Sequence, residues 1–256
     1  MSEPSIHTSA DELVETEASV LRLGVKQLTF AASDGGTLPY CQCTAGDDLP
    51  GDYALLVFLH GAGSVGTDNW KPVRIPGPPL KRYLARHGEK AVVLFPQCAE
   101  GCKWVDVPWE SSSHSLPDEP STHMRRLMEL FESKLKELPI NRSRIYAGGI
   151  SMGGYGAWDL VSRYPTTFAA ILAICGGADT CQAPNLARLP AYIVHGDDDP
   201  AVPVCRARDI ASALKQVGNT QVVYRELPNA GHNAWTPSFA DETALQWLFS
   251  QRRNRD

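Results

Sequence analysis

Residues 144–158 read RIYAGGISMGGYGAW, and this stretch decides the fold. Its apolar start, Arg144–Ala147, predicts a β-strand, and the residues after Ser151 predict a helix that ends near Tyr164, where Pro165 stops it. The letters between them, GISMG, match the pattern G-x-S-x-G. A serine on a tight turn between a strand and a helix stands at the carboxyl edge of a sheet with its hydroxyl exposed. The stretch therefore predicts Ser151 as a nucleophile.

Strand-like apolar runs continue on both sides of this stretch. Further strands are expected at Val25–Phe30, Leu38–Cys43, Tyr53–Leu59, Ala91–Phe95, Ala169–Cys175, Ala191–Val194 and Gln221–Tyr224. The runs are nearly continuous rather than alternating, which is typical of parallel strands covered on both faces. The first two are joined by Asp34-Gly35-Gly36, a hairpin signal, so they are expected to pair antiparallel at the edge of the sheet.

Helical patterns fill the connections between the strands. The clearest pattern places six apolar side chains on one face at 3.6-residue spacing: Met124, Leu127, Met128, Phe131, Leu135 and Leu138. Two more helices are expected at Pro203–Val217 and Phe239–Gln251. Strands that alternate with helices of this length imply right-handed βαβ units. The predicted fold class is therefore α/β, with a doubly wound, mostly parallel sheet and antiparallel N-terminal edge strands.

The 256 residues are expected to form one catalytic domain, residues 25–256, after a polar N-terminal arm, residues 1–24. The segment Cys98–Thr122 interrupts the regular alternation, because it is rich in Ser, Pro and Trp and contains no periodic run. Loops of this length inside a compact domain are usually functional or disordered. It is the one segment long enough to cover a site at the edge of the sheet.

Charge and hydropathy exclude several classes of partner. The net charge of −5 comes without a Lys/Arg cluster, so no nucleic-acid partner is expected. The longest apolar run, Phe168–Cys175, is far shorter than the roughly 20 residues of a membrane span. Five acidic residues precede the first base, Arg22, unlike a secretory signal, so a cytoplasmic location is expected. The sequence does not indicate an oligomeric state.

Seven cysteines, an odd number in a chain large enough to need no disulfides, are expected to be mostly buried thiols. Cys98 and Cys102 are spaced like a small-loop disulfide or half of a metal site. No second pair of cysteines or histidines with zinc-site spacing completes such a site, so no metal is expected.

A serine hydroxyl is a weak nucleophile, and it needs a base within hydrogen-bond distance and a third group that holds the base. In enzymes whose serine lies on such a turn, the acid and then the histidine follow it in the chain. His195 fails this order, because its neighbouring acids come after it, and His232 remains. The acid is expected in the loop that contains Asp197, Asp198 and Asp199. Asp199 is the first choice, because it begins a D-x-x-V-P turn, and Asp198 is the alternative.

The oxyanion that forms on attack needs backbone N–H donors, each worth roughly 3–4 kcal/mol in the transition state. Met152, directly after the nucleophile, is expected to supply one donor. The loop at 60–63, HGAG, is expected to supply the other, from Ala62 or, as the second choice, from Gly61. His60 precedes the serine and is expected to anchor this loop rather than to act as a base.

These motifs resemble those of serine esterases of the α/β-hydrolase superfamily, related to the phospholipase/carboxylesterase, dienelactone hydrolase and polyhydroxybutyrate depolymerase/feruloyl esterase families. LHGAG at 59–63, GTDNW at 66–70 and PQC at 96–98 are similar to segments of bacterial predicted peptidases and esterases. The resemblance runs from about residue 25 to 251. Dienelactone hydrolases carry a cysteine where this chain has Ser151, and the lid insertions of true lipases are missing.

The resemblance implies a carboxylesterase that works through an acyl-enzyme, on a small-molecule ester and without a cofactor. Trp104 and Trp109 are expected to form an apolar or aromatic wall for the acyl group, with core packing as the alternative for either. Three other functions stay open at this point: a serine peptidase, an acyl-thioesterase, and a non-catalytic binding protein with the same fold. The last is disfavoured because all three positions of the triad are filled.

Overall fold

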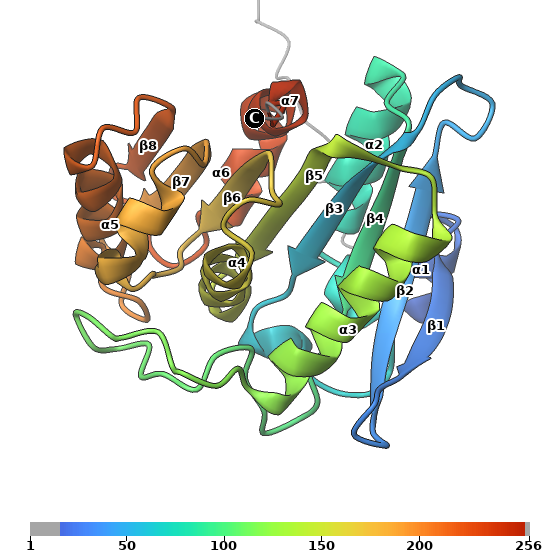
Figure 1. The fold of residues 1–256 in the computed structure, drawn as a ribbon, viewed down its shortest axis with the longest axis horizontal. Coiled ribbons are helices and arrows are strands. Elements are labelled where there is room, and N and C mark those ends of the chain that lie inside the picture. Colours follow the sequence, from blue (N-terminus) through green and yellow to red (C-terminus); the bar gives the residue numbers. More distant parts are fainter. Residues whose placement is uncertain (1–15, 254–256) are drawn as a thin grey trace, which may run out of the picture.

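The computed structural model describes residues 16–253 and contains one eight-stranded sheet in the order β1-β2-β4-β3-β5-β6-β7-β8 (Figure 1). The strands β3 to β8 are parallel, while β1 pairs antiparallel with β2, and β2 with β4. Their bounds are β1 Lys26–Ala31, β2 Thr37–Ala45, β3 Tyr53–Leu59, β4 Ala91–Pro96, β5 Ile140–Ile150, β6 Ala170–Ile174, β7 Ala191–Gly196 and β8 Val222–Leu227. The predicted α/β architecture is confirmed.

Helices cover both faces of the sheet. The α-helices are α1 Glu17–Leu21, α2 Gly77–His87, α3 Thr122–Glu137, α4 Met152–Arg163, α5 Cys205–Gln216, α6 Trp235–Ala240 and α7 Thr243–Ser250, and short 3₁₀ helices lie at Ala62–Ser64, Lys71–Val73 and Thr180–Leu186. The helices α3, α4 and α5 pack on one face, and α1, α2, α6 and α7 pack on the other (Figure 1). This two-sided cover explains why the inner strands β3, β4, β6 and β7 are apolar along almost their whole length.

Strand β3 shows how one apolar run serves two cores. Leu55, Val57 and Leu59 belong to the core on the α3–α4–α5 side, whereas Ala54, Leu56 and Phe58 belong to the opposite core. Successive strand residues point to opposite faces, so every residue of such a strand is buried. The carboxyl ends of the parallel strands therefore rest on a fixed support.

Two helical segments differ from the predictions. The helix α2 was not predicted, because Pro78 and Pro79 occupy its start; proline is tolerated in a first helical turn, and the buried Leu80 and Leu84 follow at helical spacing. The single helix predicted at Phe239–Gln251 is wrong, since α6 and α7 replace it. They are separated at Glu242, which has a φ of 57°.

The break at Glu242 is held by side chains of α2. The Glu242 carboxylate accepts hydrogen bonds from Arg86 (2.8 Å) and from His87 (3.2 Å), and Arg82 lies 3.8 Å away. These contacts join residues about 155 positions apart in the chain, so helical periodicity alone could not reveal them.

The long segment between β4 and α3 contains no regular helix or strand, as predicted for Cys98–Thr122. It runs beneath α4 toward α5 (Figure 1) and is bound at several points. Tyr155 of α4 donates to the Trp109 carbonyl (3.1 Å), and the Leu116 N–H donates to Asp179 (2.9 Å). We call residues 97–121 the β4–α3 loop.

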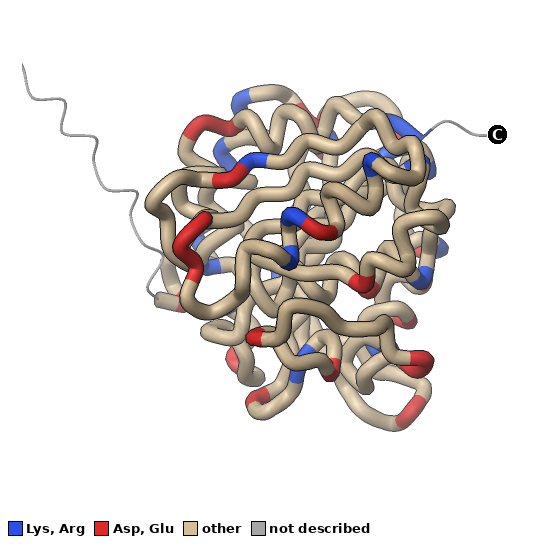
Figure 2. Tube along the Cα trace, turned by 90° about the vertical axis from the view of Figure 1, so that its left-hand side faces the viewer, with Lys and Arg blue, Asp and Glu red and all other residues tan. Residues whose placement is uncertain are grey.

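The N-terminal helix α1 packs against the core on the side of α2. Of the predicted arm, residues 1–15 lie outside the described residues; within the rest, α1 buries Val20 completely against the core. No helix in residues 16–253 is long and apolar enough to span a membrane. Basic and acidic residues are intermixed on the side of the molecule drawn in Figure 2, and the described residues form no broad positive patch there.

Candidate active site

Ser151 lies between β5 and α4 with a φ of 55° and a ψ of −120°, a conformation that L-residues rarely adopt. Two glycines make this turn sterically feasible. A Cβ on Gly149 would lie 2.1 Å from the Gly153 carbonyl oxygen, and a Cβ on Gly153 would lie 2.0 Å from that of Leu59. The helix α4 therefore approaches both β5 and the end of β3 more closely than any side chain allows. This approach holds Ser151 at the carboxyl edge of the sheet.

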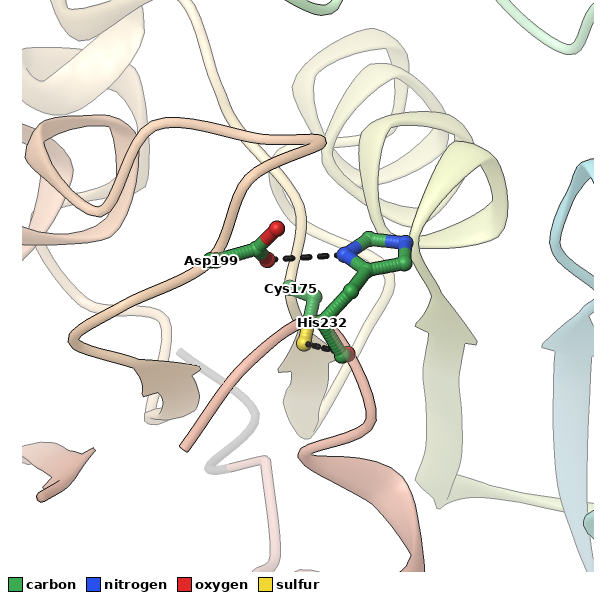
Figure 3. A group of neighbouring side chains, drawn as sticks. All are labelled: Cys175, Asp199 and His232. Carbon is green, nitrogen blue, oxygen red and sulfur yellow. Dashed lines mark hydrogen bonds and ion pairs between the residues drawn. The ribbon is translucent and has the colours of Figure 1, made fainter. Parts of the chain in front are cut away.

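His232 and Asp199 reach Ser151 from two other connections at the same edge. Asp199 follows β7, and His232 lies in the loop between β8 and α6. The Ser151 Oγ is 2.9 Å from His232 Nε2, and His232 Nδ1 is 2.7 Å from Asp199 Oδ2 (Figure 3 shows the second contact). With Nδ1–H donating to the carboxylate, Nε2 is free to accept the serine proton. The structure thus brings together the three residues predicted for the triad.

The Asp199 carboxylate is buried, with none of its side chain exposed, whereas 26% of the His232 side chain is exposed. Burial alone raises the pKa of Asp199, but hydrogen bonds from His232 and from the N–H groups of Val202 and Ala201 outweigh it and hold the pKa below its ordinary value. The two N–H groups contact the second oxygen, Oδ1, at 3.0 and 2.8 Å. The carboxylate is therefore charged at neutral pH. Asp198, the alternative acid, is exposed.

A second histidine contacts the same carboxylate, which the sequence did not reveal. His195, fully buried at the end of β7, places Nε2 3.2 Å from Asp199 Oδ2 and 2.9 Å from the Val202 carbonyl oxygen. Burial lowers the pKa of His195, so the ring is neutral. Its exclusion as the base was based on chain order alone. Its position directly before the acid-bearing turn is the sequence signal that indicates a supporting role.

Cys175 supports His232 from below. It follows β6 with a φ of 51°, and its thiol donates to the His232 carbonyl oxygen at 3.1 Å (Figure 3). Burial raises the pKa of the Cys175 thiol to about 12, so it carries no charge at neutral pH. Cys175, Asp199 and His232 offer ligand atoms within 4.8 Å of one another. Because the acid and the imidazole already bind each other and the thiol is neutral, this donor set does not fit a metal ion.

The two amides predicted as oxyanion donors each lie at the start of a helix. Met152 is the first residue of α4, and Ala62 is the first residue of the 3₁₀ helix that follows β3. The N–H groups at such a start have no acceptor within their own helix. A Cβ on Gly61 would lie 3.4 Å from the Ser151 Cβ, so this loop passes directly beside the nucleophile.

His60 anchors this loop, as predicted. Its Nδ1–H donates to the Gly61 carbonyl (2.7 Å), and its Nε2 accepts the Cys98 N–H (2.9 Å). Burial lowers the pKa of His60 to about 4, which keeps the ring neutral and both bonds intact. The ring thereby joins the loop after β3 to the start of the β4–α3 loop.

The prediction that Trp104 lines an acyl site is wrong, because none of its surface is exposed. Its indole N–H donates to the His60 carbonyl (3.2 Å), and its ring packs against Gly156 of α4. It supports the loop of His60 from inside the core. Trp109 is half-buried, with the Lys103 ammonium 4.5 Å from its ring centre, and its role in substrate contact stays a prediction.

All seven cysteines are free thiols. Cys98 is buried and Cys102 is exposed, so the disulfide considered for this pair is not formed. Cys41, Cys43, Cys98 and Cys175 are buried, as predicted for most of the thiols.

The chain is similar to one described family and to several known proteins. The sequence profile of the family described as Phospholipase/Carboxylesterase matches residues 50–244. A solved thermostable esterase is 32% identical with a TM-score of 0.79, over 90% of this chain and 63% of that chain. Esterase LipQ of Mycobacterium tuberculosis is 44% identical over 43 residues, 17% of this chain and 10% of that protein.

A solved ferulic acid esterase shares the fold, with a TM-score of 0.66 and 16% identity over 88% of this chain and 97% of that chain. The present chain spans less than two thirds of the length of the thermostable esterase, and its match to Esterase LipQ covers only a small part of that protein.

Proposed function

Because the chain belongs to the phospholipase/carboxylesterase family, we propose that it hydrolyses a carboxylic ester with Ser151 as the nucleophile, His232 as the general base and Asp199 as the orienting carboxylate. One observation carries this proposal. A continuous chain of hydrogen bonds joins Asp199, His232 and Ser151 with donor–acceptor distances of 2.7 and 2.9 Å. Such a chain activates a serine hydroxyl at neutral pH.

The reaction follows from these contacts. As the Ser151 Oγ attacks the carbonyl carbon, its proton passes to His232 Nε2, and the charged imidazole is stabilised by Asp199. The N–H groups of Met152 and Ala62 receive the oxyanion. His232 then donates its proton to the departing alcohol, which leaves an acyl group on Ser151. A water molecule, deprotonated by His232, attacks the acyl-enzyme, and His232 returns this proton to the Ser151 Oγ as the acid is released.

The test compares several bond types in one enzyme. We expect the full chain to hydrolyse members of a p-nitrophenyl ester panel from acetate to palmitate, assayed beside feruloyl esters, an acyl thioester and aminoacyl amides. Ser151→Ala is expected to reduce the activity at least about 10³-fold. Ser250→Ala, which changes an exposed serine at the end of α7, is the matched control. Turnover of amides or thioesters in excess of esters would instead support the peptidase or thioesterase alternative.

A second test needs no substrate. A fluorophosphonate probe, which attacks only activated serines, is expected to label Ser151, as located by peptide mass spectrometry. The variant His232→Ala should label far more slowly, because it lacks the base. Labelling at another serine, or full ester hydrolysis by Ser151→Ala, would refute the proposed nucleophile.

A further inference from the structure

A cavity of about 290 Å³ lies between the β4–α3 loop and α5. Its polar lining comes from Ser112, Ser113 and His114 of the loop, from Thr180, and from four residues of α5: Arg206 in the first turn, Asp209, Ser212 and Gln216. None of these residues was singled out by the sequence, and none belongs to the triad.

Arg206 has an environment that is unusual for a charged residue. It is 2% exposed, and among residues 16–253 no carboxylate forms an ion pair with it. Its Nε donates to the Tyr155 hydroxyl (3.3 Å), its guanidinium lies 5.2 Å from the centre of the same ring, and its Nη2 donates to His114 Nδ1. These partners are neutral. A buried charge without a counter-ion destabilises the folded protein, and an anion in the adjoining cavity would offset this cost.

The other ionisable groups near the cavity leave this charge uncompensated. Burial, together with the Arg206 charge, lowers the pKa of His114 to about 4, so the imidazole is neutral. Asp179 acts on His114, but its carboxylate already accepts the N–H groups of Leu116 and Cys181. Asp209 lines the cavity, is exposed, and forms no ion pair with Arg206. A positive charge therefore faces a polar, water-accessible space.

Arg206 contacts two segments that also carry residues of the proposed active site. Tyr155, which binds Arg206, is four residues after Ser151 in the chain, about 6 Å along the axis of α4. A Cβ on Gly177 would lie 2.5 Å from Arg206 Nε, and Gly177 comes two residues after Cys175, the thiol that contacts His232. Arg206 is thus bound to the same helix and adjoins the same strand end as the catalytic groups.

We propose that this cavity is a subsite for a carboxylate of the substrate, with Arg206 as its binding cation and Ser112, Ser113 and Thr180 as hydroxyl donors. The enzyme would then prefer esters that carry a negative charge in the acyl or the alcohol part, at a distance of several bonds from the scissile carbonyl. Arg206 binds and positions such a substrate and takes no part in bond cleavage. This inference rests on the proposed esterase function.

The test uses the full chain and two pairs of esters that differ only in charge. Monoethyl adipate is compared with the ethyl ester whose free carboxylate is replaced by a carboxamide, and 4-acetoxybenzoate is compared with 4-acetoxybenzamide. The rate of acid release from each ester is measured by pH-stat. We expect kcat/KM of the charged member to exceed that of the neutral member about tenfold or more in at least one pair. Equal kcat/KM values within both pairs would overturn the proposal without any variant.

Variants locate the preference. Arg206→Met is expected to abolish the preference for the charged ester, and Arg206→Lys is expected to retain part of this preference. The ratio of the two kcat/KM values within a pair does not change when the amount of active protein falls. Arg208→Met is the matched control, because Arg208 lies on the same helix, is exposed, and pairs with Glu226 instead. A preference that survives Arg206→Met would refute the assignment.

Three further outcomes are distinguishable. If inorganic phosphate inhibits competitively while neither pair shows a preference, the cavity holds a free anion and the substrate assignment is wrong. If no ester of the pairs or of the p-nitrophenyl panel is hydrolysed, the proposed function fails together with the subsite. Hydrolysis of the neutral esters without any preference would remove the subsite alone.

Discussion

Replacing Asp199 with asparagine should stabilise the tautomer of His232 that cannot act as the base. The hydrogen bonds around Asp199 explain this effect. Asp199 Oδ1 accepts two N–H groups, from Ala201 and Val202, while Oδ2 accepts the His232 Nδ1–H. An asparagine must keep its carbonyl oxygen toward the two N–H donors, which turns its NH₂ group toward His232. The imidazole would then accept at Nδ1 and carry its proton on Nε2, where it cannot take the proton of Ser151.

The size of the effect follows from this reversal. A triad histidine held in the wrong tautomer loses about 10⁴-fold in kcat, which corresponds to about 5 kcal/mol of transition-state stabilisation. Asparagine and aspartate have the same shape, so the folded structure should persist. We therefore expect a loss of about 10³–10⁴-fold in kcat, together with a modest change in melting temperature.

The assay measures kcat and KM on p-nitrophenyl butyrate for the unaltered chain, Asp199→Asn and Asp198→Asn. Asp198 is the matched control, because it is the exposed neighbour in the same turn and was the alternative acid. Its substitution should change kcat less than about twofold, as expected for a surface change of well under 0.5 kcal/mol. Retention of more than a tenth of the activity by Asp199→Asn, or a large loss in Asp198→Asn, would refute the assignment of the acid.

Three further predictions concern stability. Gly153→Ala should lower the free energy of unfolding by about 3 kcal/mol or more, because the new Cβ would meet the Leu59 carbonyl. The control Gly63→Ala, whose Cβ would have no atom within 4 Å, should change this free energy little. Urea unfolding compares the two variants. Ser151→Gly should be more stable than Ser151→Ala by about 1 kcal/mol, because glycine relieves the φ of 55° at some entropic cost; equal melting temperatures would contradict the strain. Acidification from pH 7 to pH 5 should lower the free energy of unfolding. The pKa of His60 is about 4 in the folded protein and 6.5 in an ordinary histidine, so below pH 6.5 the unfolded chain binds a proton that the folded protein does not. This difference should remove about 3 kcal/mol of stability by pH 4. An unchanged midpoint of urea unfolding between pH 7 and pH 5 would contradict this effect of His60.

The strands and the motif around Ser151 were predictable because each depends on local chemistry. Buried parallel strands must be apolar on both faces, and the turn at Ser151 needs small residues beside it. Asp199 and His232 were found from their order and from the turns that contain them. Their hydrogen bonds bring together residues 33 and 81 positions apart in the chain, as the predicted topology requires.

Other features depend on contacts that no local pattern encodes. Trp104 looks like a surface aromatic in a polar loop, but the loop folds back and buries it beneath His60. The break before α7 is held by α2, which lies more than 150 residues earlier in the chain. Arg206 occurs in an ordinary amphipathic helix, and its isolation from acids appears only when α4, α5 and the β4–α3 loop are in place. In each case the missing information is which distant side chain comes close.

The attachments of the β4–α3 loop bear on how substrate reaches the enzyme. Asp159 and Arg163 of α4 form a two-contact ion pair, at 2.7 and 3.1 Å, and the Arg163 guanidinium also binds the Pro117 carbonyl (2.9 Å). With Trp109 bound to Tyr155 and Leu116 bound to Asp179 as well, hydrogen bonds hold the loop at several points along its length. A lipase lid must open at an oil–water boundary, and we expect a loop held by this many hydrogen bonds to stay in place instead. We expect rates to follow the monomer concentration of an ester and to show no jump when micelles form.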